Sequence, residues 1–249
     1  MFGTLALNNS DLLILILICF FAGLIRGFSG FGLSAFVMSL ALTIIPPIEL
    51  IPVCWWMEFV ASVFMIRNGW KDSDKKISII LWLGAVFGLP IGIALTTILD
   101  FQTSKIVALF LILILALILL RNFKIQFLST SVGTISSGVF AGVATGLASI
   151  GGMIVAIYVL ASQNSARRVR ASIVLYIFLN SVTTFIFLIL FDVMDHKAFV
   201  RGVLLAVPSS IGVVLGSILF MQKLEKYYRP FSLGLLISFS LVGLIRLTG

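Results

Sequence analysis

Long apolar runs, separated by short polar clusters, make up most of this chain of 249 residues. A helix that crosses a membrane needs about 20 mostly apolar residues, and several runs approach that length. The pattern predicts an all-α integral membrane protein with about 8–10 membrane segments. The apolar runs lie at 11–25, 31–46, 50–66, 77–98, 104–120, 132–146, 147–161, 171–191, 198–221 and 231–247.

Two pairs of runs are individually short for a full crossing, namely 11–25 with 31–46 and 132–146 with 147–161. Glycine separates the two members of each pair. Short apolar segments interrupted by glycine are typical of broken or re-entrant helices. We therefore expect both pairs to be broken helices.

The two glycine-rich breaks also match each other. Residues 22–32 align with residues 141–151 without a gap, and the same register continues into the next apolar run. This similarity predicts two copies of one unit, at 1–122 and 123–249, that together form one transmembrane domain. The alternative is that glycine is simply frequent in membrane helices. The matched pairs are Gly23 with Gly142, Gly27 with Gly146, Gly32 with Gly151, Ser62 with Ser181 and Val63 with Val182.

The basic residues between the runs indicate how the two units face the membrane, because cytoplasmic loops are enriched in Lys and Arg. If each broken pair returns to its starting side, twelve basic residues face one side and four face the other. If each pair crosses once, the split is nine to seven. We therefore expect inverted halves, with both termini outside the cytoplasm. The larger group is Arg67, Lys71, Lys75, Lys76, Arg121, Lys124, Arg167, Arg168, Arg170, Lys223, Lys226 and Arg229, and the smaller group is Lys105, Lys197, Arg201 and Arg246.

Composition argues against most other classes of protein. Hydrophobic residues make up 61% of the chain and charged residues 10%, against about 25% charged in soluble domains. The mean hydropathy is +1.23. The net charge of +8 is explained by cytoplasmic loops and does not indicate nucleic acid binding. Cys19 and Cys54 lie in apolar runs, so we interpret them as small buried hydrophobic residues.

An enzyme is not expected, and neither is a cofactor or metal site. Membrane enzymes need a nucleophile with a base, or a metal centre. The sequence contains no HExxH or GxSxG motif and no cysteine spacing typical of metal sites. Its single histidine, His196, lies in a polar loop far in sequence from any candidate nucleophile.

The breaks are the best candidates for a binding site. Irregular backbone at membrane depth occurs only where protein buries it or where it lines a wet cavity. Helix N-termini at such breaks carry partial positive charge and bind anions. The alternative is that the glycines only allow close helix packing. The candidates for substrate contact are Ser29, Gly30, Gly32, Thr145, Ser149, Gly151 and Gly152.

Two charged residues, Arg26 and Glu58, lie well inside apolar stretches, where they are costly and therefore candidates for function. Arg26 could grip an oxyanion with its guanidinium, or could form a purely structural salt bridge with Glu58. Glu58 is also a candidate proton carrier, which makes protons a candidate coupling ion. Thr145 and Ile177 align with these two residues, so the site is expected to be asymmetric. Asn180 and Ser181 could present neutral polar groups to the same cavity.

These features resemble a known family. The first break, Gly27-Phe28-Ser29-Gly30-Phe31-Gly32, is followed by the turn Pro46-Pro47. The second, Gly146-Leu147-Ala148-Ser149-Ile150-Gly151-Gly152, precedes the basic stretch Arg167-Arg168-Val169-Arg170-Ala171-Ser172. Over essentially its full length the chain resembles the sulfite exporter TauE/SafE family of membrane transporters. Many relatives carry a run of glycines at the first break, where this chain has the bulky Phe31.

The resemblance implies secondary transport of a small anion, such as sulfite or an organosulfonate, across the cell membrane of a bacterium. The expected partners are therefore the anionic substrate and the lipid bilayer. Two alternatives stay open, an anion channel that shares the same site and a membrane scaffold that transports nothing.

Overall fold

The computed structural model describes residues 8–42, 44–121, 130–161 and 165–220, together with residues 234, 237, 238, 241 and 245. Within the four continuous ranges the chain forms nine helices and no strand. They are α1 (Asn9–Ser29), α2 (Leu33–Ala41), α3 (Pro47–Asp72), α4 (Lys75–Ile98), α5 (Phe101–Arg121), α6 (Ser131–Ala148), α7 (Gly151–Ala161), α8 (Ala166–Leu190) and α9 (His196–Phe220).

Six of the described helices are long and apolar enough to cross a membrane. The helix bounds follow the expected apolar runs closely, except that most of the run 231–247 lies outside the described residues. The basic residues Lys124, Lys223, Lys226, Arg229 and Arg246 also lie outside them. The prediction of an all-α, multi-pass membrane protein is confirmed.

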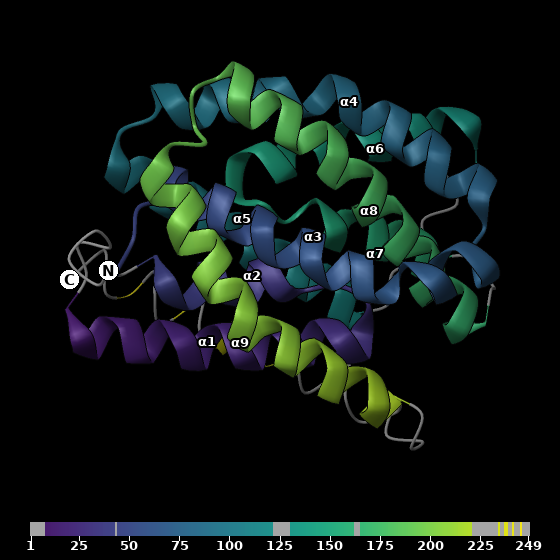
Figure 1. Ribbon diagram of the computed structural model, residues 1–249. Coiled ribbons are helices and arrows are strands. Elements are labelled where there is room, and N and C mark those ends of the chain that lie inside the picture. The colour runs from purple at the N-terminus through teal and green to yellow at the C-terminus, as the bar shows by residue number, and fades with distance from the viewer. Residues whose placement is uncertain are drawn as a thin grey trace.

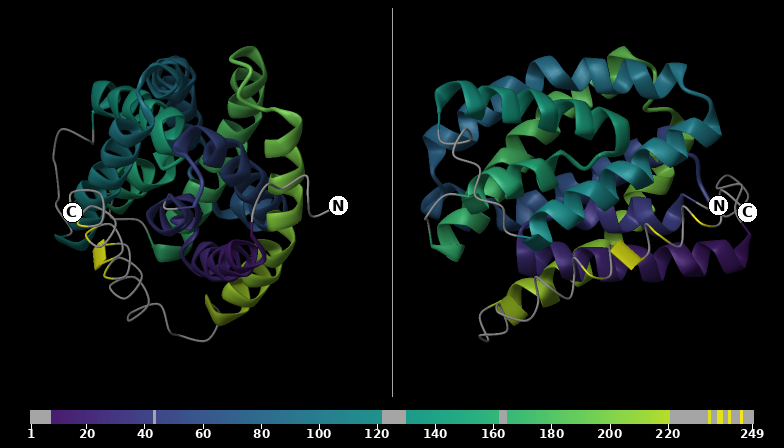
Figure 2. Two further views of the ribbon diagram at one scale, coloured as in Figure 1. Left: turned by 90° about the vertical axis from the view of Figure 1, so that its left-hand side faces the viewer. Right: turned by 180° about the vertical axis from the view of Figure 1, so that it is seen from behind.

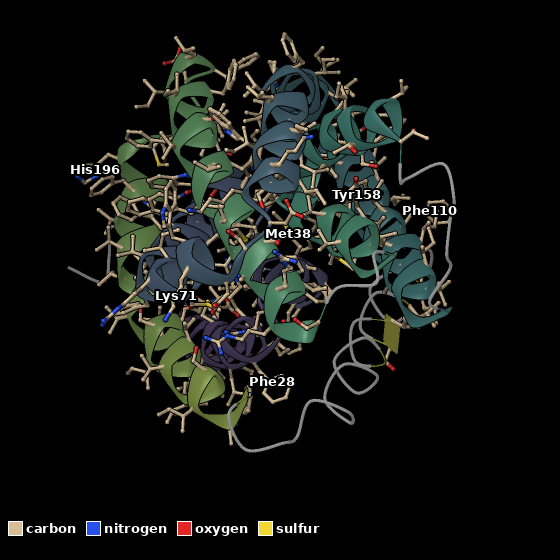
Figure 3. All side chains as sticks on the ribbon, turned by 90° about the vertical axis from the view of Figure 1, so that its right-hand side faces the viewer. Phe28, Met38, Lys71, Phe110, Tyr158 and His196 are labelled. Carbon is tan, nitrogen blue, oxygen red and sulfur yellow. The ribbon has the colours of Figure 1, made fainter. Side chains whose placement is uncertain are left out.

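The outer surface of the bundle is apolar. Phe87 and Ile98 are 71% and 80% exposed, which water would penalise and lipid tails would not. Figure 3 shows Phe110 at the outside of the bundle and Met38 near its centre, where Met38 is fully buried. The helices therefore present to lipid the kind of residue that soluble proteins bury.

Two tightly packed helix pairs form opposite edges of the bundle. Helix α1 packs along α9, and α4 packs along α6. Figures 1 and 2 show α1 and α4 on opposite edges, with α3 between them. Helix α3 contacts α8 and α9, and α8 also contacts α4, so α3 and α8 join the two edges.

Glycine allows the close approach within each pair. A Cβ atom on Gly23 would lie 2.0 Å from the carbonyl oxygen of Ser209 in α9. A Cβ atom on Gly88 would lie equally close to that of Val139 in α6. Both distances are too short for any side chain, so these glycines serve helix packing, as small residues commonly do between membrane helices.

The described helices repeat in the register seen in the sequence. Shifting Gly23 onto Gly142 carries the end of α1 at Ser29 onto the end of α6 at Ala148. The residue that follows each of these ends has a left-handed backbone, with φ of 84° at Gly30 and 57° at Ser149. The arrangement is compatible with the expected duplication.

Side-chain contacts place the charged residues at two ends of the bundle. Arg167 at the start of α8 forms an ion pair with Asp72 at the end of α3, with an Nε–Oδ2 distance of 2.8 Å. Lys197 and Arg201 near the start of α9 pair with Glu49 near the start of α3. We call the first the basic end and the second the opposite end. This is the arrangement expected if each broken pair returns to its starting side.

Candidate functional site

Each break is made by a residue that ends one helix and lets the next begin. The Gly30 N–H donates to the Arg26 carbonyl at 2.8 Å and closes α1. Gly30 and Gly32 both have positive φ, which glycine adopts without steric cost. Ser149 takes the same left-handed conformation after α6, although it carries a Cβ atom. The chain then restarts as α2 and α7.

The first break contains a buried ion pair. Arg26 is completely buried, and its Nε lies 2.8 Å from Oε2 of Glu58 in α3. Its Nη2 donates to the Ser62 hydroxyl at 3.0 Å, and its Nη1 donates to the Gly30 carbonyl. The other carboxylate oxygen of Glu58 accepts from the Ser34 N–H at 3.3 Å and from the Ser34 hydroxyl at 3.0 Å. The salt bridge that the sequence left as one alternative is therefore formed.

A small polar cavity, which we call the central cavity, lies where α3, α6, α7 and α8 meet. Its volume is about 30 Å³, which is enough for a water molecule. A sulfonate would need the cavity to widen. The lining residues are Trp55, Glu58, Thr145, Ser149, Gly152, Tyr176, Ile177, Asn180, Ser181 and Thr184.

Two polar atoms on the wall of the central cavity have no hydrogen-bond partner in the described part of the chain. They are the Tyr176 hydroxyl and Oδ1 of Asn180. The two side chains are 0% and 6% exposed. Buried polar groups are almost always paired, and an unpaired one costs about 1–3 kcal/mol. Two such groups on one wall make this wall a candidate site for a polar ligand.

The structure brings together about half of the residues singled out from the sequence. Thr145, Ser149, Gly152, Asn180 and Glu58 line the central cavity. Gly151 lies against them, since a Cβ atom there would sit 2.1 Å from the Thr145 hydroxyl oxygen.

The first-break candidates Ser29, Gly30 and Gly32 are not among the cavity lining. The Ser29 hydroxyl bonds instead to the carbonyls of Ile25 and Phe31, at 2.9 and 2.6 Å.

Sequence reasoning missed Tyr176 and Trp55 on the cavity wall. A signal for Tyr176 was available, since it stands next to Ile177, which aligns with Glu58. Trp55 donates its indole N–H to the Ser181 carbonyl at 2.7 Å, and this bond ties α3 to α8 beside the cavity.

A larger cleft of about 710 Å³ opens between α3, α8 and α9. Asp72, Arg167 and Arg170 lie on it at the basic end, and Met65 and Val174 line its apolar part. Seven residues of helix separate Met65 from Glu58, which is about 10 Å along α3. The cleft therefore reaches to within two helical turns of the central cavity.

Arg170 connects this cleft to the first break. Its guanidinium donates to the Phe28 carbonyl at 3.1 Å and to the Gly27 carbonyl, both at the end of α1. It thus satisfies carbonyls that the end of a helix leaves without a partner inside the helix. Among the described residues, no group of three His, Cys, Asp or Glu side chains is placed to hold a metal ion.

Two broken helices, one of which borders a buried polar cavity, inside a bundle with an apolar outer surface are typical of membrane proteins of the transporter type. The chain belongs to the sulfite exporter TauE/SafE family, whose model matches residues 15–243. A family of transporters favours a transporter over an enzyme here. No match is found among curated proteins or solved structures.

Proposed function

We propose that this protein is a secondary transporter that moves a small anion across the cell membrane, and that the anion is sulfite, a related sulfur oxyanion or an organosulfonate. The observation that carries the proposal is the central cavity, where unpaired polar groups and helix ends lie in the middle of an apolar bundle. Membership of the sulfite exporter family supports the chemistry of the substrate.

The small volume of the central cavity favours a carrier over a channel. A channel needs a continuous path, whereas the central cavity has room for little more than water. Contacts of Glu49 with Lys197 and Arg201 join α3 and α9 at the opposite end. In a carrier the cleft would serve as the entrance from the basic end, which we assign to the cytoplasm.

Glu58 is the proposed coupling residue. It lines the cavity, so an anion bound there would place a second negative charge beside its carboxylate. A proton carried at Glu58 would offset the repulsion between the two negative charges, so we propose that the proton and the anion move together, as proton-coupled transport requires.

Flux into proteoliposomes tests this function. The purified protein is reconstituted and offered sulfite, taurine and methanesulfonate, with and without a pH gradient. We expect saturable flux of at least one of them that a pH gradient drives. Flux that does not saturate and ignores the gradient would indicate a channel, and the absence of all flux would indicate a scaffold.

A further inference from the structure

The anion at the first break is a side chain of the protein itself, the carboxylate of Glu58. The Ser34 N–H, in the first turn of α2, and the Ser34 hydroxyl both donate to the Glu58 carboxylate. The start of a helix binds anions because its first N–H groups lack partners inside the helix and carry partial positive charge. Glu58 therefore occupies the anion position at the start of α2, and Arg26 balances its charge.

The second break has the same backbone plan without the carboxylate. In the register that matches Gly32 with Gly151, Glu58 corresponds to Ile177 and Arg26 to Thr145. Ile177 reaches the first turn of α7, since a Cβ atom on Gly152 would lie 2.9 Å from its Cδ1. The Met153 N–H, which corresponds to that of Ser34, already donates to the Ile150 carbonyl at 2.9 Å. The apolar Ile177 cannot accept from the N–H groups of Gly151 and Gly152 at the start of α7, and Gly152 lines the central cavity.

The unpaired groups of the cavity wall come from α8, the helix that carries Ile177. The Tyr176 hydroxyl can donate to an oxyanion. The Asn180 amide nitrogen faces the hydroxyls of Thr145 and Thr184 at 3.5 and 3.4 Å. Both hydroxyls already donate their protons to backbone carbonyls, so the amide must be the donor in these contacts. Oδ1 of Asn180 is therefore an acceptor left without a donor.

We propose that the start of α7, together with Tyr176 and Asn180, binds the head of a small oxyanion at the position equivalent to that of the Glu58 carboxylate in the first half. The inference rests on the proposed function and refines it. Arg26 is then a positioning residue that holds Glu58, and it does not touch the substrate. Neutral donors bind the anion, because Glu58 is the one charged side chain among the described residues that line the cavity and it is already paired with Arg26.

The Asn180 acceptor also narrows the class of ligand. An oxyanion that carries a hydrogen-bond donor, as hydrogensulfite does on oxygen and taurine on nitrogen, can satisfy Oδ1 of Asn180 while its oxygens accept from Tyr176 and α7. Methanesulfonate offers no such donor. We therefore expect methanesulfonate to bind more weakly than the other two, by a factor of about 5–10 for one lost hydrogen bond.

Binding to the detergent-purified full chain tests the site without relying on transport. Titration calorimetry with hydrogensulfite, taurine and methanesulfonate is run on the wild type, Tyr176→Phe and Tyr158→Phe. Tyr158 is the matched control, because its hydroxyl is buried but paired with Thr134 at 2.6 Å. We expect Tyr176→Phe to weaken binding by about 10-fold or more, as for a hydrogen bond to a charged group, and Tyr158→Phe to change it less than 3-fold.

A second pair of variants places a longer side chain of the protein in the proposed anion site. Ile177→Glu gives the second half its own carboxylate and should abolish anion binding, whereas the neutral Ile177→Gln should keep it within about 10-fold. Size-exclusion profiles show whether each variant folds. If Ile177→Glu does not fold, the binding measured for Tyr176→Phe tests the site.

Anion binding that is equal in the wild type and Tyr176→Phe would overturn the inference, as would a wild type that binds none of the three anions. Binding with the expected variant pattern but without flux would retain the site and refute the proposed function. Flux that Tyr176→Phe leaves unchanged would retain the function and refute the site.

Discussion

The two breaks are built on one backbone plan and differ in their chemistry. In both, a helix ends in a left-handed residue and a second helix starts two or three residues later. The first break is occupied by the Arg26–Glu58 pair, whereas the second adjoins a cavity with unpaired Tyr176 and Asn180. A duplicated scaffold can thus hold an ion pair of its own in one half and leave unpaired neutral groups in the other.

The bonds that hold the scaffold recur in both halves, while the charges do not. Ser217 of α9 donates to the Gly27 carbonyl at 3.1 Å, and Thr96 of α4 donates to the Gly146 carbonyl at 3.0 Å. Among the described residues, only the first of these helix ends also accepts from an arginine side chain, that of Arg170. Neutral hydrogen bonds therefore hold both breaks, and contacts of Arg170 add to them at the first one.

The largest expected effect is the labelling of an introduced cysteine from one side of the membrane and not from the other. Ser165 is exposed at the start of α8, at the basic end, and His196 starts α9 at the opposite end. Cysteine at Ser165 should react with an impermeant thiol reagent only from the cytoplasm, and cysteine at His196 only from outside. Cys19 and Cys54 are buried and provide the unreactive background. We also expect cytoplasmic labelling at Gln222, which lies outside the described residues.

Labelling of Ser165→Cys from outside intact cells would end the proposed orientation. It would also show that the entrance cleft, on which Arg167 and Arg170 lie, opens away from the cytoplasm.

The next largest effect is the loss of the ion pair at the first break. Glu58→Gln leaves Arg26 buried without its counter-charge, and the free energy of unfolding should fall by about 3–5 kcal/mol. Asp72→Asn is the matched control, because its partner Arg167 is 69% exposed, and such pairs contribute about 0–1 kcal/mol. Thermal melts in detergent measure both. Equal melting temperatures for Glu58→Gln and Asp72→Asn would show that the buried ion pair does not stabilise the first break more than an exposed pair would.

A smaller change in stability is expected from exchanging the two left-handed residues, Gly30 at the first break and Ser149 at the second. Gly30→Ser should destabilise the protein by about 1–2 kcal/mol from the left-handed backbone alone, and its Cβ would also lie 2.8 Å from Cγ of Arg170. Ser149→Gly relieves the same strain but gains entropy in the unfolded chain, so its net effect should stay within about 1 kcal/mol. Chemical denaturation of both variants measures the difference. A Gly30→Ser protein as stable as Ser149→Gly would mean that the first break is not the more constrained one.

The smallest effect lies outside both breaks and provides a baseline for pH experiments on them. Hydrogen bonds from the Thr103 hydroxyl and N–H, and from the Gln102 N–H, hold the pKa of the exposed Asp100 carboxyl below its usual value. A lowered folded-state pKa stabilises the protein above the unfolded pKa of about 3.9, and this contribution is lost as the pH falls through the folded-state pKa. Asp100→Asn should remove this small pH dependence in melts below pH 4, and an unchanged profile would contradict it.

The membrane class, the positions of the helices and the two breaks followed from the sequence, because lipid imposes long apolar runs and glycine marks the places where they stop. The same reasoning selected Arg26 and Glu58, since ionised groups are rare inside a bilayer. It left open whether they pair, because 32 residues separate them along the chain and only the packing of α3 against α1 sets their distance.

Tertiary structure alone decided which polar groups share a cavity. Ser29 and Ser149 look equivalent in sequence, yet Ser29 bonds to its own backbone and Ser149 lines the cavity. Tyr176 stands next to the residue that aligns with Glu58, but only the packing of α8 against α3 and α7 decides that its hydroxyl has no partner among the described residues. Apolar periodicity reports which residues avoid water, whereas the pairing of buried polar atoms depends on neighbours that are distant in the chain.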